Sequence, residues 1–267
     1  MGYGVDRNEV LRYLGYAGQA MEPGLLGRID AIIDRCEQDL SPKSIVGYFG
    51  IVVHGADAAD PSGGVGCAGG AEEPCSESEC AGGAEEPCGE TQCADGLAYV
   101  DVAGASLRLP GFDIVRHLRG ARECALFACT LGARSEQELA RLNIANPLDA
   151  LVYDAACSAL IERVADATEA RIVAEAAERG LHANWRYGPG YGDLPLSVQP
   201  QFLSVLKAFE TIGLSVTDTD LLLPTKSITA IVGLFDAPPA AEKPRVCESC
   251  NMKDFCTLRA KGRVCHG

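Results

Sequence analysis

Residues 185–196 read Trp185-Arg186-Tyr187-Gly188-Pro189-Gly190-Tyr191-Gly192-Asp193-Leu194-Pro195-Leu196. Three glycines and two prolines interrupt any helix or central strand here, because proline lacks an amide donor and glycine admits conformations closed to other residues. Because so few side chains are bulky here, the stretch predicts a surface on which a small polar ligand lies. Arg186 would hold a carboxylate of that ligand, and Tyr191 would cover its apolar face. The alternative is a rigid turn that closes a strand, with Arg186 in a surface ion pair.

The segments on either side of this stretch predict a mixed fold. Short β-branched runs bounded by glycine indicate strands at 48–53, 97–102, 124–129, 181–187, 214–217 and 227–235. The first two are expected to pair. Helical spacing of apolar residues indicates helices at 8–15, from 23 onward, at 112–118 and at 197–210. Asn8 is expected to cap the first of these. A further short helix is predicted to start at Ser135, where Ser135 and Glu138 form a capping box. Because helices and strands do not alternate regularly, the predicted class is α+β, with a largely antiparallel twisted sheet flanked by helices.

The longest helix is predicted from Asn146, its cap, to Arg179, with Pro147 at the first helical position. Its apolar stripe is expected to contain Leu151, Ala155, Ile161, Val164 and Ala165. Asp154 and Glu162 border that stripe. They are either functional acids or, as the favoured interpretation, part of a solvated helix edge.

The negative charge of the chain is concentrated in one block. Residues 55–96 contain ten acidic residues and no lysine or arginine, so the rest of the chain carries only four of the 14 net negative charges. No basic stripe indicates a nucleic-acid partner. No apolar run approaches the roughly 20 residues of a membrane span, and no signal peptide is recognisable at the N-terminus. The prediction is a soluble, cytoplasmic protein without a membrane or nucleic-acid partner.

The thirteen cysteines fall into three groups. Four lie in predicted helices and strands and are expected to be small core residues: Cys36, Cys124, Cys129 and Cys157. Five belong to the acidic block, where Cys-Ala-Gly-Gly-Ala-Glu-Glu-Pro-Cys at 67–75 recurs at 80–88. This repeat predicts a disordered insertion at a hairpin tip, at about 55–96, which either binds soft metals or has no function.

The last four cysteines follow a proline-rich linker at 237–241. They are spaced Cys247-x-x-Cys250, Cys256 and Cys265. Four thiolates on a short segment suit Zn²⁺ or an iron–sulfur cluster, and the alternative is free thiols. The predicted organisation is therefore a main domain at 1–236 and a linker with a metal-binding tail at 237–267.

Four blocks of the chain resemble, in family order, the activation (reactivation) domain of cobalamin-dependent methionine synthase. They are Leu11-Arg12-Tyr13-Leu14-Gly15-Tyr16, Thr130-Leu131-Gly132, Arg186-x-x-Pro189-Gly190-Tyr191 and Leu223-Pro224-Thr225-Lys226-Ser227-Ile228-Thr229-Ala230. The third block is similar to the S-adenosylmethionine-binding motif of that family. Its continuation, residues 192–196, is closer to the free-standing activation-domain-like proteins of anaerobes. The resemblance covers most of the chain except residues 55–96 and the tail.

The resemblance implies reactivation of methionine synthase by reductive methylation. In that system cob(II)alamin is reduced by one electron, here from flavodoxin or ferredoxin, and the resulting cob(I)alamin takes the methyl group of S-adenosylmethionine. The chain would dock on the cobalamin module of methionine synthase or a related corrinoid protein and would position the reactants without a catalytic residue of its own. The implied cofactor-binding residues are Arg186, Gly188, Pro189, Gly190, Tyr191, Pro224 and Ser227.

The chain departs from the family shortly after the fourth motif block. Larger members carry an aromatic pair after the Pro-x-x-Ser block, where this chain has Val232-Gly233. A second hypothesis follows from this departure and from the cysteine-rich tail. The protein would be a metal-binding (Zn or Fe–S) interaction or electron-transfer protein that keeps the fold without using S-adenosylmethionine.

Overall fold

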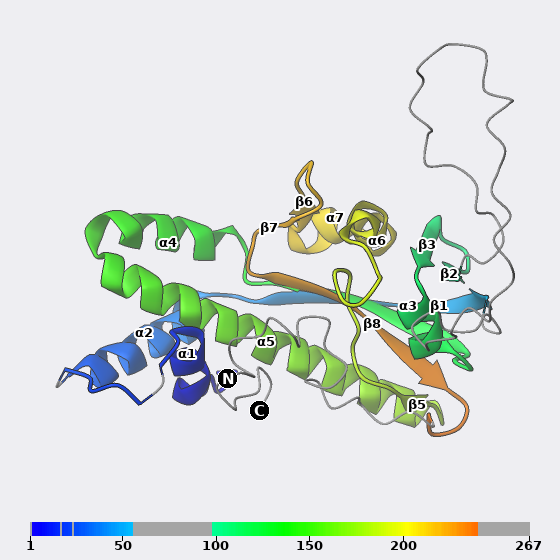
Figure 1. Cartoon of the computed structure of the whole chain (residues 1–267), viewed down its shortest axis with the longest axis horizontal. Helices are drawn as coiled ribbons and strands as arrows, with labels where there is room; N and C mark the ends of the chain where they lie inside the picture. Colours follow the sequence, from blue (N-terminus) through cyan, green and yellow to red (C-terminus); the bar gives the residue numbers. More distant parts are fainter. Residues whose placement is uncertain (1, 17, 23, 56–97, 240–267) are drawn as a thin grey trace, which may run out of the picture.

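A computed structural model of the chain describes residues 2–16, 18–22, 24–55 and 98–239. Its centre is a six-stranded sheet in the order β3-β2-β1-β4-β8-β5, in which every neighbouring pair is antiparallel (Figure 1). The strands are β1 (Lys43–His54), β2 (Tyr99–Val102), β3 (Leu107–Pro110), β4 (Glu123–Thr130), β5 (His182–Ala183) and β8 (Ser227–Phe235). The predicted α+β class with a largely antiparallel sheet is confirmed, and so is the pairing of β1 with β2.

Both faces of the sheet are covered by helices, so β4 is buried along almost its whole length. Alternate residues of β4 enter two separate cores: Phe127 and Cys129 face one, and Leu126 and Ala128 face the other. The first core is closed by α1 (Arg7–Tyr13), α2 (Leu25–Asp39), α4 (Ala133–Ala145) and α5 (Pro147–Glu178). The second is closed by α3 (Phe112–Leu118), η1 (Leu196–Val198), α6 (Gln199–Leu206) and α7 (Ala208–Ile212). A two-stranded sheet, β6 (Ser215–Val216) and β7 (Leu222–Leu223), follows α7.

The 32-residue helix α5 extends along the sheet and carries several residues of the candidate site described below (Figure 1). Asn146 caps it as predicted, accepting a hydrogen bond from the Asp149 amide at 3.3 Å. Leu151, predicted in the apolar stripe, is 58% exposed, and that assignment is wrong. Because α5 packs against α1, α2, α4 and the sheet, its buried face is broad and includes Val152, Tyr153 and Leu160, which leaves Leu151 on the outside.

Two predicted helix caps are wrong. The cap of α1 is Asp6, whose Oδ1 accepts from the Asn8 amide at 2.9 Å, so Asn8 lies inside the helix. In α4 the helix begins at Ala133, two residues before the predicted Ser135 cap. The Ser135 hydroxyl instead donates to the carbonyl of Gly132 at 2.8 Å. The backbone of Gly132, with φ of 80°, starts this helix without a side-chain cap.

The elements after α5 are more broken than predicted. Only two residues of the 181–187 strand form β5. At the next residue the Asn184 amide donates to the Gly233 carbonyl at 3.1 Å, but the Gly233 amide donates to the Asn184 side chain at 2.7 Å and not to its backbone. The helix expected at 197–210 is interrupted at Lys207, whose left-handed backbone (φ 52°) separates α6 from α7. Strands β3 and β7 were not predicted. The acidic repeat at about 55–96 and the cysteine-rich tail fall outside the described residues, apart from Gly55.

Candidate functional site

The glycine-rich bend after β5 is a closed turn pressed against β8. Tyr187 and Ile231 exchange two backbone hydrogen bonds of 2.9 and 2.8 Å. A side chain on Gly188 would bring its Cβ to 2.8 Å from the Thr229 carbonyl oxygen, so only glycine allows this contact. The Gly190 amide then donates to Leu194 at 2.8 Å and closes the bend. Gly188 and Pro189 are consequently buried, whereas residues 190–193 are exposed.

The Arg186 side chain points to α5, where three carboxylates meet it. Nη1 donates to Asp166 at 2.7 Å and to Glu169 at 2.5 Å, and Nη2 donates to Glu162 at 3.0 Å. The backbone amide of Arg186 also donates to Glu169, at 3.0 Å. Burial alone would lower the pKa of Arg186, but the hydrogen bonds to Asp166 and Glu169 outweigh it and raise that pKa. We call Arg186, Glu162, Asp166 and Glu169 the arginine cluster.

The arginine cluster has an open edge and an excess of negative charge. A guanidinium has five N–H donors, and within the described chain three of them are used by carboxylates. The Nε–H and one Nη2–H remain, which is the pair that grips a carboxylate side-on. Asp166 is also paired with Arg163 at 3.4 Å, so two cations meet the three carboxylates and leave one net negative charge. The ion pair anticipated for Arg186 is therefore present, but as a partly open cluster.

The second motif block, residues 224–227, is bonded to the end of β4. The Ser227 hydroxyl lies 2.6 Å from the Pro224 carbonyl oxygen and 2.7 Å from Thr130 Oγ1. The Leu131 amide donates to the Lys226 carbonyl at 2.9 Å. The blocks at 130–132 and 224–227 thus form one structural unit, in which the Ser227 hydroxyl holds the turn together.

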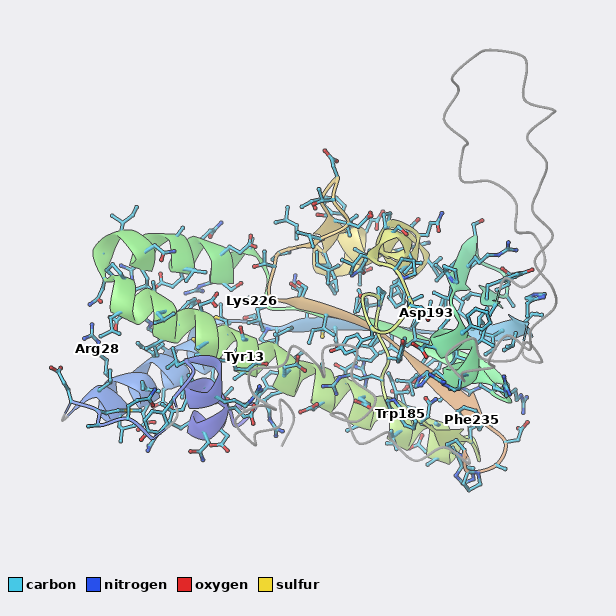
Figure 2. All side chains as sticks on the ribbon, in the orientation of Figure 1. Tyr13, Arg28, Trp185, Asp193, Lys226 and Phe235 are labelled. Carbon is cyan, nitrogen blue, oxygen red and sulfur yellow. The ribbon has the colours of Figure 1, made fainter. Side chains whose placement is uncertain are left out.

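Lys226 reaches the same helix as Arg186. Its Nζ lies 2.8 Å from Asp154 Oδ1 and 2.8 Å from Ser158 Oγ, and its side chain is 17% exposed. Asp154, Ser158, Glu162 and Asp166 are spaced four residues apart, so they form one row along α5. Figure 2 shows Lys226 and Trp185, the neighbour of Arg186, along the length of α5. The side chains of Asp154 and Glu162 are 45% and 41% exposed, in keeping with the favoured interpretation of a solvated helix edge, and each also binds a cation from a different motif block.

The N-terminal block also borders this row. Tyr13 at the end of α1 has a raised pKa, first because it is partly buried and then because Glu162 is negatively charged. Figure 2 places Tyr13 beside α5. A cavity of about 10 Å³, enough for one water, lies at the other end of the row, lined among others by Ser135, Tyr153 and Lys226. Arg186 does not line this cavity.

The opposite side of the 185–187 segment is lined by aromatic rings and the imidazole of His117. The ring of His117 on α3 lies 5.2 Å from Trp185 and 5.1 Å from Tyr187. Burial lowers the pKa of His117 to about 4, against smaller opposing effects of the backbone of Trp185 and Ile231. Its Nε2 is buried and has no hydrogen-bond partner among residues 2–55 and 98–239 that the structure describes. His117 is therefore neutral near pH 7.

Sequence reasoning missed several of these residues. Asp166, Glu169 and Lys226 were not singled out, although the four-residue spacing from Asp154 to Asp166 was a usable signal. Val232 and Gly233, where the family departure lies, are both buried within β8. The four cysteines expected in the core are buried and unpaired, which confirms that prediction. The cysteines of the repeat and of the tail lie outside the described residues.

No protein-family model matches the chain, and no curated protein matches it. Among solved structures, one described as the crystal structure of the MetH reactivation domain bound to AdoHcy matches 98% of this chain and 82% of that chain, with a TM-score of 0.57 and 13% sequence identity. The chain has the reactivation-domain fold. This finding agrees with the resemblance carried by the four motif blocks. No helix in the described part of this reactivation-domain fold combines the length and hydropathy of a membrane span.

Proposed function

We propose that the protein binds S-adenosylmethionine and supports reductive methylation of the cobalamin of methionine synthase or a related corrinoid protein. The observation that carries the proposal is the open edge of the arginine cluster next to the bend at 188–191. The reactivation-domain fold supports it, because a domain with this fold was solved with AdoHcy.

The charges of the arginine cluster suit the amino-acid end of this ligand. Its carboxylate would take the free Nε–H and Nη2–H edge of Arg186. Its ammonium group would approach Glu162, which at 41% side-chain exposure is more accessible than Glu169 at 19%. The positive sulfonium is favoured near a cluster with a net negative charge. A site with both signs of charge therefore fits a cationic amino-acid ligand better than a plain carboxylate.

The bend would accept the rest of the ligand. Tyr191 is 59% exposed, so its ring can cover an apolar face of the nucleoside. Gly190 would present backbone groups, while the buried Gly188 and Pro189 would hold the bend in place. Pro224 and Ser227 would border the ligand from the turn after β7.

The chemistry requires positioning more than acid–base groups. S-adenosylmethionine supplies the methyl group, and the partner's cobalamin accepts it once an electron donor such as flavodoxin or ferredoxin has reduced the cobalt. The chain would hold the ligand in line with the docked cobalamin module and limit its motion.

Calorimetry with S-adenosylmethionine tests the proposal. The wild type should bind, and Arg186→Ala should weaken binding about tenfold or more, since a charge-assisted bidentate contact is lost. Arg141→Ala is the matched control, because Arg141 pairs with a carboxylate at 2.7 Å on the surface of α4. It should bind like the wild type. A wild-type protein that does not bind S-adenosylmethionine would contradict the proposal. Recovery of activity by an oxidised cobalamin methyltransferase would extend it.

A second candidate function rests on the spacing of Cys247, Cys250, Cys256 and Cys265. We propose that this tail holds Zn²⁺ or an iron–sulfur cluster. A metal-binding interaction or electron-transfer protein would then need no S-adenosylmethionine. Iron and zinc analysis of anaerobically purified protein, compared with Cys247→Ser/Cys250→Ser, tests it. Metal-free wild-type protein would remove the tail from either function.

A further inference from the structure

We propose that Asp193 is a positioning residue, which holds the ligand-binding bend in place from the N-terminus of α3. This inference rests on the proposed function, since it concerns how the bend is presented to S-adenosylmethionine. Arg186 anchors the start of the bend to α5, and Asp193 anchors its end to the opposite side of the sheet. Tyr191 and Gly190 lie between these two anchors.

The first observation is a helix cap supplied from far along the chain. Helix α3 is preceded by Gly111, which has no side chain to cap it. The Asp193 carboxylate does so instead: Oδ2 accepts from the Phe112 amide at 2.6 Å, and Oδ1 accepts from the Asp113 amide at 3.1 Å. These contacts join residues 81 and 80 positions apart. A carboxylate at a helix start is favoured by the free amides and by the helix dipole.

The second observation is the lack of space at this junction. A side chain at Gly111 would collide with the Asp193 carboxylate, and one at Gly192 would collide with Asp113 and the Tyr187 hydroxyl. Both glycines also have positive φ, 131° and 53°. Two residues without side chains are therefore needed for the bend to meet α3 so closely.

The third observation links this junction to the ligand-facing residues. The Tyr187 hydroxyl donates to the Tyr191 carbonyl at 2.8 Å, and the Tyr191 amide donates to Gly188 at 3.1 Å. The turn that bears Tyr191 is thereby held between Tyr187 on one side and Asp193 on the other. Without Asp193, residues 190–193 lose their attachment to α3, while the arginine cluster keeps its contacts to α5.

The test combines ligand affinity with the fluorescence of Trp185, the single tryptophan of the chain. Asp193→Ala should weaken S-adenosylmethionine binding about tenfold, in line with the cost of misplaced positioning groups. Asp193→Asn keeps one acceptor oxygen and should recover part of that affinity. The emission of Trp185, which contacts His117 on α3, should shift in Asp193→Ala and less in Asp193→Asn.

The matched control is Asp6→Ala. Asp6 caps α1, which like α3 has seven residues. Its carboxylate accepts from the amide of Asn8, only two residues further along the chain, and it lies at the opposite end of α1 from Tyr13. This variant should lose helix stability while S-adenosylmethionine affinity and Trp185 emission stay as in the wild type. Equal affinity of wild type and Asp193→Ala would overturn the inference and leave the proposed function intact. Absence of binding by the wild type would overturn both.

Discussion

The two sides of the short segment 185–187 are held by different physical forces. On the α5 side, Arg186 meets three carboxylates in a half-open, charged cluster. On the α3 side, Trp185 and Tyr187 meet His117, a buried imidazole that stays neutral. The charged side keeps donors available for a ligand. On the aromatic side the buried Nε2 of His117 has no hydrogen-bond partner in the described chain, so this side is expected to be the more sensitive to a new charge.

Acid should therefore act most strongly on the aromatic side. The unfolded chain protonates His117 below about pH 6.5, whereas the folded protein does so only near pH 4. The unfolding free energy is therefore unaffected by His117 above about pH 6.5, and it falls by about 3 kcal/mol as the pH is lowered toward 4. Urea denaturation at pH 7 and pH 4.5 should show a smaller acid loss in His117→Gln than in the wild type. Parallel pH profiles of the two proteins would refute the expected role of His117.

On the charged side, Arg186→Ala should lower the unfolding free energy by about 2 kcal/mol. This loss lies between the losses typical of buried ion pairs and of surface ion pairs, because the cluster is partly exposed. The reason is repulsion among Glu162, Asp166 and Glu169 once Arg186 is gone, since Arg163, 3.4 Å from Asp166, compensates only part of their charge. Arg186→Lys keeps the charge but not the fork and should recover about half. Urea denaturation at low and high salt measures the effect, and a loss independent of salt would speak against repulsion.

Lys226→Met should cost about 1 kcal/mol, less than the loss at Arg186. Methionine retains the packing of the aliphatic part of the Lys226 side chain. The substitution removes the cation from only one carboxylate, that of Asp154, which is 45% exposed and can be solvated by water. Thermal denaturation of Lys226→Met and Arg186→Ala under the same conditions compares the two losses of stability directly. A larger loss for Lys226→Met would mean that burial, and not the number of carboxylates, decides the strength of each cluster.

Glu162→Gln should have the smallest effect on stability, within about 0.5 kcal/mol. The exposed Glu162 is one of three carboxylates, and glutamine keeps an acceptor for Nη2 of Arg186. Its affinity for S-adenosylmethionine should fall by about threefold to tenfold as the negative charge of the cluster is reduced. Unchanged affinity would mean that the ligand's positive groups lie elsewhere.

Much of the architecture was predictable because local signals agreed with the final packing. Strand β8 at 227–235 and the long helix from Pro147 were found with nearly correct bounds, since each combines a clear periodicity with a turn or cap residue. The errors occur where long-range contacts prevail over local preference. The Asn184 side chain takes over one ladder bond in the predicted 181–187 strand, and Leu151 faces outward because α5 is covered on several other sides.

By itself, the sequence determined the fold class, the place of the glycine-rich bend and the four motif blocks, because periodicity and turn residues act over a few neighbouring positions. Only the tertiary structure decided the partners of those blocks. Glu162, Asp166 and Glu169 are 17 to 24 residues from Arg186, and Asp193 is 80 residues from the helix it caps. Such pairings depend on how α5, α3 and β8 pack around the bend, and no local spacing encodes that packing.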